Sequence, residues 1–482
     1  METYELTRWL FLRAVAFIYC IAFAVAINQF RALCGERGLV PVPFFLKRMT
    51  WKDCPSLFWI HYSDRFAGIL GWLGLALAIV ALTGIADQAG FAVNIGLWFA
   101  LWLFYLSFVN VGQVFYSFGW ETLLLETGFL TIFLSPSHIA TPEVLIWLLR
   151  WLLFRNMFGA GLIKLRADPC WYDLTCLHYH YQTQPMPNPL SWYFHYLPGA
   201  LHKSSVLFTH ITELIIPWLY FAPQPFCAVA GLITVFFQLM LVFSGNLSWL
   251  NWITIVLCIP CFSDQYLAYI IPWSAPTLSL IATPPAWIFV LILLTIAIVY
   301  LSIQPTINLF SPYQAMNASF DSLHLVNTYG AFGSVTKRRF EIVVEGTYDD
   351  LPSDSAEWRE YAFKAKPGDV SRRPPIIAPY HLRLDWLMWF AAMAPVSHHP
   401  WFIHLVAKLL IGDKSTLKLM ASDPFPDQPP QFIRAVLYEY VFTKPEERSS
   451  NWWTRRRISL YLEPQSLFDT RIEYSLRARS ML

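Results

Sequence analysis

Residues 159–198, GAGLIKLRADPCWYDLTCLHYHYQTQPMPNPLSWYFHYLP, form the most unusual stretch of this 482-residue chain. The stretch begins inside an apolar segment and leaves it through Lys164 and Arg166. Prolines in its second half exclude a continuing helix, because proline lacks a backbone N–H and restricts the residue before it. Its aromatic content is too high for disorder. We therefore predict an ordered, extended, aromatic loop over residues 164–205, and loops of that length usually serve a function.

The overall composition is typical of an integral membrane protein. Hydrophobic residues make up 56% of the chain and charged residues only 14%, whereas soluble proteins carry about 25% charged residues. The apolar residues lie in long runs, which predicts helices that cross the bilayer. A net charge of +2, with no nucleic-acid motif and no phosphate-binding glycine loop, argues against a nucleic-acid partner.

Nine apolar runs are each close to the ~20 residues that a helix needs to cross the hydrocarbon core. We expect a multi-span membrane domain of about nine helices over residues 1–304, in which the first run is an uncleaved signal anchor. One run, 247–262, is short and contains Asn251 and Pro260. The nine runs are residues 11–28, 66–85, 91–109, 114–134, 144–163, 206–221, 226–243, 247–262 and 287–303.

The pattern changes near residue 304 to mixed polar and alternating residues, which indicates strands buried on one face. We expect residues 305–482 to form a water-facing C-terminal α+β domain built on an antiparallel β-sheet. The fold class is thus a multi-pass α-helical membrane protein with such a domain. Strands are predicted at 339–348, 358–364, 432–442 and 456–462, and helices at 382–393 and 401–411.

Several idiosyncratic stretches resemble the lipase maturation factor family. They are FRNMFGAGLIKLR before the central loop, SGNLSWLNW after it, QFRALCGERGLVPVP near the start, and RRFEIVVEGTYDD and PYHLRLDWLMWFAAM in the last third. In animals, members of this family are multi-pass membrane proteins of the endoplasmic reticulum, needed for certain secreted lipases to fold and dimerise into active enzymes. The resemblance implies a membrane-anchored folding factor with a secreted, lipase-like client, membrane lipid as a further partner, and no cofactor.

The aromatic side chains of the central loop are the expected client surface, because large amphipathic side chains are enriched at protein interfaces. The compact loops between spans look more like those of a bacterial relative, whose client need not be the animal lipase. The protein would lie in the endoplasmic reticulum membrane of a eukaryote or the inner membrane of a bacterium. The candidate client-binding residues are Trp171, Tyr172, Tyr179, Tyr181, Trp192 and Tyr193.

The membrane orientation rests on opposing signals. With nine spans, residues 30–65, the central loop and the C-terminal domain share one face. Basic residues in 30–65 favour the cytoplasm for that face. The cysteines of the polar loops, the N-x-S sequons at Asn246 and Asn317 and the lumenal loops of the resembling family favour the lumenal or periplasmic side, which we predict.

Cys170 and Cys176 are the best disulfide candidates, since the five residues between them permit a local bridge. A bridge between Cys34 and Cys54 would similarly restrain the first loop. Structural disulfides suit an oxidising compartment. Free thiols and an exchange-active pair stay open as alternatives, and the nearby Lys164 would favour the thiolate that exchange requires.

Charged residues inside the apolar runs are costly in hydrocarbon and indicate either paired interiors or functional sites. Glu121 and Glu126 lie in one run, Arg150 and Arg155 in the next, and Lys164 near the end of that second run. One interpretation is that Glu121 or Glu126 pairs with Arg150 or Arg155 between adjacent helices. The other is a polar cavity for a substrate, an ion or a lipid headgroup.

Histidines provide two further predictions. His210 and Glu213 are i, i+3 on one helix face, and we predict a buried hydrogen bond between them. Metal ligation would need further ligands at fixed geometry, so the loop histidines are interpreted as hydrogen-bonded aromatic residues and no metal site is predicted. These loop histidines are His178, His180, His195 and His202.

The chain has no G-x-S-x-G motif and no catalytic triad, so it is not itself a lipase. The alternative function is a membrane enzyme, because the multi-span part resembles, more faintly, the membrane domain of vitamin K-dependent γ-carboxylases. Lys164 would then be a base, since a desolvated lysine can lose its proton near neutral pH. Glu121, Glu126, Arg150 and Arg155 would line its cavity. We expect a folding factor rather than an enzyme.

Overall fold

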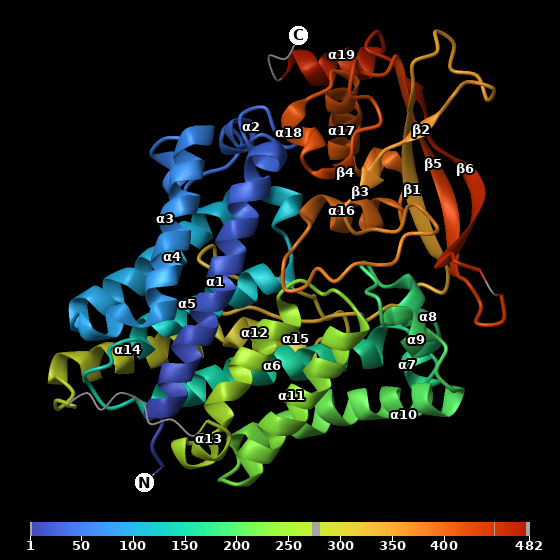
Figure 1. Ribbon diagram of the computed structural model, residues 1–482. Helices are drawn as coiled ribbons and strands as arrows, with labels where there is room; N and C mark the ends of the chain where they lie inside the picture. Colours follow the sequence, from blue (N-terminus) through green and yellow to red (C-terminus); the bar gives the residue numbers. More distant parts are fainter. Residues whose placement is uncertain (1, 272–279, 448, 479–482) are drawn as a thin grey trace.

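A computed structural model describes residues 2–271, 280–447 and 449–478 of the chain. Figure 1 shows a bundle of helices that fills the lower and left parts of the view, and a sheet with its own helices at the upper right. The N-terminus lies at the lower end of helix α1 (Glu5–Cys34), and the chain ends beyond α19 (Thr470–Arg477) at the opposite end of the molecule. The first part holds the long apolar helices and the second holds the antiparallel sheet.

Six helices among the described residues are long and apolar enough to cross a membrane. They explain six of the nine predicted spans, because an apolar run of about 20 residues can satisfy its backbone only as a helix in hydrocarbon. They are α1, α3 (Asp64–Thr83), α4 (Phe91–Val111), α6 (Glu143–Ala167), α11 (Phe226–Ser244), and α14 (Pro285–Leu301) continued by α15 (Ile303–Phe310).

The other three predicted spans are helical but short or interrupted. Helix α5 (Gly119–Leu134) has 16 residues, a length of about 24 Å at 1.5 Å per residue. Regular α-helix ends at His210 and at Cys258. Pro217 and Pro260 follow within the next irregular turns and lack the backbone N–H that an α-helix would need there. The number of spans therefore stays a prediction. The interrupted segments are α10 (Gly199–His210) with η4 (Ile211–Ile215) and η5 (Ile216–Phe221), and α12 (Leu250–Cys258) with η6 (Ile259–Cys261).

Helix α1 lies at the centre of the membrane part and packs against α3, α4, α5 and α12. Its Phe23 ring makes an edge contact with Tyr105 of α4, with ring centroids 5.6 Å apart. Gly74 of α3 allows α1 to approach, since a Cβ there would lie 2.3 Å from Phe23 Cε1. Such aromatic pairs contribute about 0.5–1.5 kcal/mol beyond burial. Short elements join the long helices: α2 (Val42–Leu46), η1 (Leu57–Trp59), η2 (Ile85–Gln88), η3 (Gln113–Phe115) and α13 (Asp264–Ile270).

The central segment, residues 164–205, differs from the predicted extended loop. It contains three short helices, α7 (Pro169–Tyr172), α8 (Leu177–Thr183) and α9 (Ser191–His195), and runs into α10. Asp168 caps α7 by accepting a hydrogen bond from the Cys170 N–H (3.0 Å), and Pro169 stands at the first helical position, where proline is favoured. The prolines of the PMPNP stretch lie between α8 and α9, so they separate helices rather than exclude them.

The C-terminal part confirms the predicted antiparallel sheet. Its strand order is β2-β1-β5-β6, and every pair is antiparallel. The prediction at 358–364 was wrong as one strand, because it divides into β2 (Arg359–Glu360) and β3 (Ala362–Phe363) on separate sheets. The remaining strands are β1 (Arg339–Thr347), β4 (Met420–Ser422), β5 (Phe432–Phe442) and β6 (Trp453–Gln465).

Helices cover one face of this sheet and connect it to the membrane part. Helix α16 (Arg383–Ala391) packs against β1, and α17 (Pro400–Leu410) packs against β5 and α19. The ends of both helices agree with those of the predicted segments to within two residues. The fold class predicted from the sequence is therefore confirmed. Two short elements complete this part, η7 (Val396–His398) and α18 (Lys414–Leu417).

Candidate functional site

Lys164 and Glu213 form a buried ion pair inside the molecule. Lys164 lies near the end of α6, and its Nζ donates to both Glu213 carboxylate oxygens at 2.7 Å. The Nζ also lies 5.4 Å from the centroid of the Trp171 ring, which adds a cation–π contact. The prediction that Glu213 bonds to His210 was wrong: His210 Nε2 lies 3.2 Å from the Trp171 carbonyl instead. Lys164, which the sequence placed near the end of an apolar run and offered as a candidate base, is the partner of Glu213.

Glu126 of α5 pairs with Arg155 of α6, which confirms the predicted pairing between adjacent membrane helices. The pair is part of a closed network. Arg155 also donates to the Asn327 carbonyl at 2.6 Å, and Glu126 accepts from the Asn327 N–H at 3.0 Å and from the Tyr329 hydroxyl at 2.8 Å. Because a buried carboxylate is stable only when its lone pairs are satisfied, this network fixes residues 327–329 to the membrane helices.

Glu121 has a partner that the sequence did not indicate. Its carboxylate accepts from Arg383 of α16 at 2.7 Å and from the Tyr105 hydroxyl. Arg383 also donates to the Phe115 carbonyl at 2.6 Å and lies over the Tyr116 ring, 3.4 Å from its centroid. The Glu121–Arg383 pair therefore joins the membrane part to the C-terminal domain.

Unlike Arg155, Arg150 has no acidic partner within the described residues. Its guanidinium donates to the Pro260 carbonyl at 3.0 Å and to the Tyr4 hydroxyl at 3.1 Å. Arg150 thus fastens α6 to η6 and to the start of the chain. The predicted pairing of intramembrane charges holds for Glu126 and Arg155, while Glu121 and Arg150 bond to groups distant in sequence.

The structure joins Cys170 and Cys176 by a disulfide that links α7 to the start of α8, with Cα atoms 4.8 Å apart. Both cysteines are buried beside Trp171 and Val206, which leaves little access for an exchanging thiol. The suggested bridge between Cys34 and Cys54 is wrong, since both are free. Cys34 instead contacts the Gly112 carbonyl and Cys54 the Thr50 carbonyl.

The six candidate client-binding aromatics fall into three groups by exposure. Trp171 and Tyr181 are buried at 3% and 7% exposure, and the Trp171 indole donates to the Phe332 carbonyl at 3.0 Å. Tyr172 and Tyr193 are exposed at 62% and 54%. The two remaining side chains are partly buried: Trp192 donates to the Thr443 carbonyl, and Tyr179 lies beside Lys337.

A second charged cluster fastens the central segment to the sheet. Arg339 of β1 is fully buried and donates to the backbone carbonyls of Gln182, Gln184 and Pro185, at distances between 2.5 and 3.0 Å. Its charge is balanced by Glu341, which also contacts Lys366 at 3.0 Å. Burial lowers the pKa of the Arg339 guanidinium, and Glu341 opposes that shift. The alternating pattern of the strand predicted neither this role nor the partner carbonyls.

A cavity of about 760 Å³ lies between the membrane helices and the C-terminal domain. Its walls come from α6, α8, α10, α11 and α12, from residues 329–336, and from α16. Lys164 and Glu213 line it, together with many apolar side chains, whereas Glu121, Glu126, Arg150 and Arg155 do not. Pockets of 300–1,000 Å³ with few polar groups are typical ligand sites, so this cavity is the candidate functional site.

Histidines near the cavity contact aromatic rings and one another. His180 lines the cavity, and burial together with the Lys164 charge lowers its pKa to about 4. His178 and His202 face each other through their Nδ1 atoms, 3.0 Å apart. Within residues 2–271, 280–447 and 449–478, no group of three or more His, Cys, Asp or Glu side chains has the arrangement of a metal site. The lining of the cavity is therefore described by hydrogen bonding and ring contacts.

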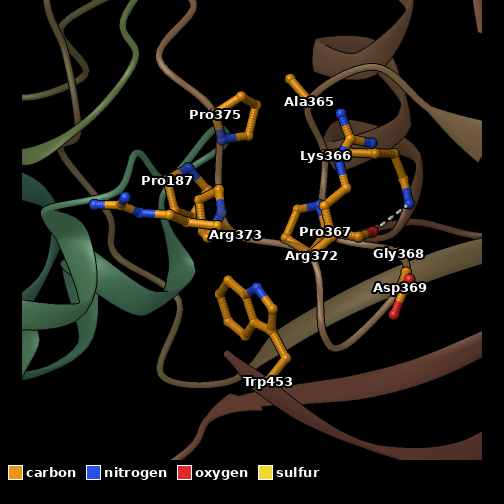
Figure 2. A pocket seen from close by; sticks show the side chains of 11 residues that line it. Pro187, Ala365, Lys366, Pro367, Gly368, Asp369, Arg372, Arg373, Pro375 and Trp453 are labelled. Carbon is orange, nitrogen blue, oxygen red and sulfur yellow. Dashed lines mark hydrogen bonds between the residues drawn. The ribbon is translucent and has the colours of Figure 1, made fainter. Parts of the chain in front are cut away.

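A second pocket, shown in Figure 2, is far smaller. It has a volume of about 10 Å³ and lies between Pro187, the turn at residues 365–369 and Trp453 of β6. The Lys366 ammonium turns back to donate to the Pro367 carbonyl at 3.0 Å. This volume accommodates about one water molecule, so the pocket is a gap in the contact between the central segment and the sheet.

Two family models match this chain over most of its length. Residues 6–269 match the lipase maturation factor transmembrane domain, and residues 325–463 match the lipase maturation factor C-terminal domain. Human lipase maturation factor 1 is 43% identical over an alignment that covers 97% of this chain and 89% of that protein. Human lipase maturation factor 2 is 30% identical, covering 98% of this chain and 84% of that protein. No solved structure matches. This chain belongs to the lipase maturation factor family.

Proposed function

We propose that this protein is a membrane-anchored maturation factor that assists secreted lipases to fold. The observation that carries the proposal is the 43% identity to human lipase maturation factor 1, which extends through both the membrane part and the C-terminal domain. The membrane would be that of the endoplasmic reticulum in a eukaryote, or the inner membrane in a bacterium. The central segment and the C-terminal domain would face the lumen or periplasm, where the client folds.

We further propose that the client contacts the exposed aromatic side chains of the central segment. Tyr172 and Tyr193 offer large rings with a polar tip, of the kind that dominate protein interfaces. Trp171 and Tyr181 support this surface from beneath, because both are buried in one core with the disulfide. The disulfide and the Arg339 contacts hold the segment in one shape, which lowers the entropy cost of binding.

The cavity does not support the enzyme as the principal function. Of the five residues assigned to it, only Lys164 lines the cavity, and its ammonium is held between the two Glu213 oxygens. A lysine that acts as a base must be free to reach its substrate, and here both Glu213 oxygens hold the Lys164 Nζ. The other four residues, Glu121, Glu126, Arg150 and Arg155, instead form contacts that hold segments of the protein together.

The test is complementation in cells from which lipase maturation factor 1 has been deleted, with secreted lipase activity as the measurement. The wild-type chain should restore activity. Tyr172→Ala with Tyr193→Ala should lower it without lowering the amount of the chain in membranes. Tyr474→Ala is the matched control, because Tyr474 is also exposed (76%) but lies on α19, at the far end of the C-terminal domain in Figure 1.

Failure of the wild-type chain to restore activity with a coexpressed lipase would overturn the maturation function for that client class. If wild type restores activity but the double variant equals the Tyr474→Ala control, the maturation function stands and the proposed client surface is wrong.

A further inference from the structure

The large cavity is amphipathic inside. Its apolar wall includes Met157 of α6, Phe208 of α10, and Phe237 and Leu241 of α11. Polar side chains interrupt this wall on α6 and α12. The Asn156 amide donates to the Thr254 hydroxyl at 2.9 Å, and the Asn251 amide donates to the Gln238 oxygen at 2.7 Å. An occupant must therefore offer both hydrocarbon and hydrogen-bonding groups.

Two amide oxygens in this lining remain available to a ligand. Each of Asn156 and Asn251 uses its NH₂ group in the bonds above, and among the described residues neither side-chain oxygen accepts a hydrogen bond. An amide oxygen has two lone pairs, so each of these oxygens can accept a hydrogen bond from an occupant of the cavity. Hydroxyl groups are donors that match these acceptors.

The charge of the lining argues against an anionic occupant. Lys164 is the one lysine or arginine among the side chains that line the cavity, and all of these belong to the described residues. Both Glu213 oxygens already bond to its ammonium. A carboxylate or phosphate that approached Lys164 would lie beside the Glu213 carboxylate, and two like charges repel each other. An uncharged polar head group has no such cost.

One side of the cavity reaches the membrane surface of the protein. Phe236 of α11 and Leu201 of α10 line the cavity and are also exposed, at 54% and 50%. The exposed side chains of α11 lie three, four or seven residues apart, that is, one or two helical turns, which defines an apolar stripe facing hydrocarbon. This stripe comprises Phe226, Val229, Leu232, Phe236 and Phe243.

The polar end of this opening is on α10. On the first turns of α10, Lys203 and Ser204 are exposed next to the exposed Leu201. Farther along the same helical segment the exposed side chains, which include Leu207 and Ile211, are apolar. This change from polar to apolar is typical of a helix that passes from the head groups into hydrocarbon. A lipid at the interface can therefore reach the cavity without leaving the bilayer.

We propose that this cavity binds an uncharged glycerolipid with free hydroxyl groups, of the monoacylglycerol class, which enters from the bilayer between α10 and α11. The hydroxyls donate to the free oxygens of Asn156 and Asn251. The acyl chain packs on the rings of Phe208 and Phe237. This site lies apart from the exposed aromatic residues to which client binding is assigned, so the two proposals can fail independently.

The test uses the full chain in lipid nanodiscs and a photoactivatable monoacylglycerol probe with an alkyne tag. Cross-linked peptides are mapped by mass spectrometry, and unlabelled monoacylglycerol, fatty acid and phosphatidylcholine serve as competitors. We expect labelled peptides from α10, α11 or α12, with competition by monoacylglycerol and at least about ten-fold weaker competition by the charged lipids.

Ala160→Phe and Ser205→Phe place a ring inside the cavity, and both should reduce labelling about ten-fold. Leu207→Phe is the control, because Leu207 lies on the same helix as Ser205 and is exposed outside the cavity. Thermal unfolding checks that each variant is folded. The wild-type peptide map and competition order decide the question even where a variant does not fold.

Labelling spread over all membrane helices, or unchanged in both cavity variants when they are folded, would overturn the site. Equal competition by fatty acid or phosphatidylcholine would overturn the assigned lipid class. Normal maturation of a lipase by a chain that shows no cavity labelling would reject this inference and leave the proposed function intact.

Discussion

Two regions of this protein bury opposite charges, and their surroundings differ. At the junction of the membrane part and the C-terminal domain, Glu121 and Glu126 are surrounded by arginine, tyrosine and backbone donors. At the cavity, Lys164 and Glu213 bond to each other and face a space of about 760 Å³. At the junction, removal of one charged partner leaves the other buried in protein. At the cavity, the charge that remains lies beside an open space. Buried charge alone therefore does not mark a ligand site.

Breaking the junction should have the largest effect. Arg383→Met leaves the Glu121 carboxylate buried with its main counter-charge removed, and we expect a loss of about 3–5 kcal/mol in the free energy of unfolding. Arg456→Met removes an exposed pair with Glu439 and should cost less than about 1 kcal/mol. Thermal unfolding in detergent measures both. Equal effects would show that the junction pair is not a buried charge.

The disulfide of the central segment, next to the cavity-lining Trp171 and Leu177, should have the second largest effect. Replacing Cys170 and Cys176 together by serine opens a loop of few residues, and the chain-entropy relation gives a loss of roughly 2 kcal/mol. Cys20→Ser, at a free and partly buried cysteine, serves as the control. Reducing agent should lower the melting temperature of the wild type but not that of the double variant. A melting temperature that reducing agent leaves unchanged in the wild type would contradict a stabilising bridge.

Acidification probes one histidine in each region. Burial lowers the pKa of His381, near Glu121, to about 4, and the pKa of His180, at the cavity, to about 4. Both histidines are neutral in the folded protein near pH 7. Their contribution to the free energy of unfolding is therefore present above the unfolded pKa of about 6.5 and is lost as the pH falls toward 4. Between pH 7 and pH 5 each should cost about 2 kcal/mol. His381→Gln and His180→Gln should each flatten the stability curve; unchanged curves would contradict the lowered pKa values.

Breaking the cavity pair should have the smallest effect. Lys164→Met leaves Glu213 facing the cavity, where water or a lipid hydroxyl can contact the carboxylate, and we expect a loss of about 1 kcal/mol. The double variant with Glu213→Leu should recover most of it, because no charge remains unpaired. A double-mutant cycle measures the coupling. A loss as large as that of Arg383→Met would remove the distinction between the two regions.

Helices and strands were predictable because their signals are local. An apolar run fixes a helix in hydrocarbon, and alternation fixed β5 at its observed bounds, Phe432–Phe442. The helices of the central segment could not be predicted in this way, since they have four to seven residues and are too short for a periodic pattern. The prolines of this segment indicated correctly that a helix stops there, but they did not indicate that short helices form on either side of them.

The candidate site was predicted only in part, because its partners are distant in sequence. Glu126 and Arg155 lie on helices adjacent in the chain, and that pairing was found. Arg383 is 262 residues from Glu121, and the pattern around it indicates a water-facing helix. Lys164 and Glu213 were both named from the sequence. We paired Glu213 with His210 because the two are close on one helix, but the tertiary fold brings Lys164 to Glu213 instead.

The most direct test of the difference between the two regions is an electron cryo-microscopy structure in lipid nanodiscs, with a bound antibody fragment. We predict lipid density in the cavity beside α10, α11 and α12, and only protein contacts around Glu121 and Glu126. A cavity closed by contact of α11 with α16, or ordered lipid density beside Glu121, would contradict the proposed difference between the two regions.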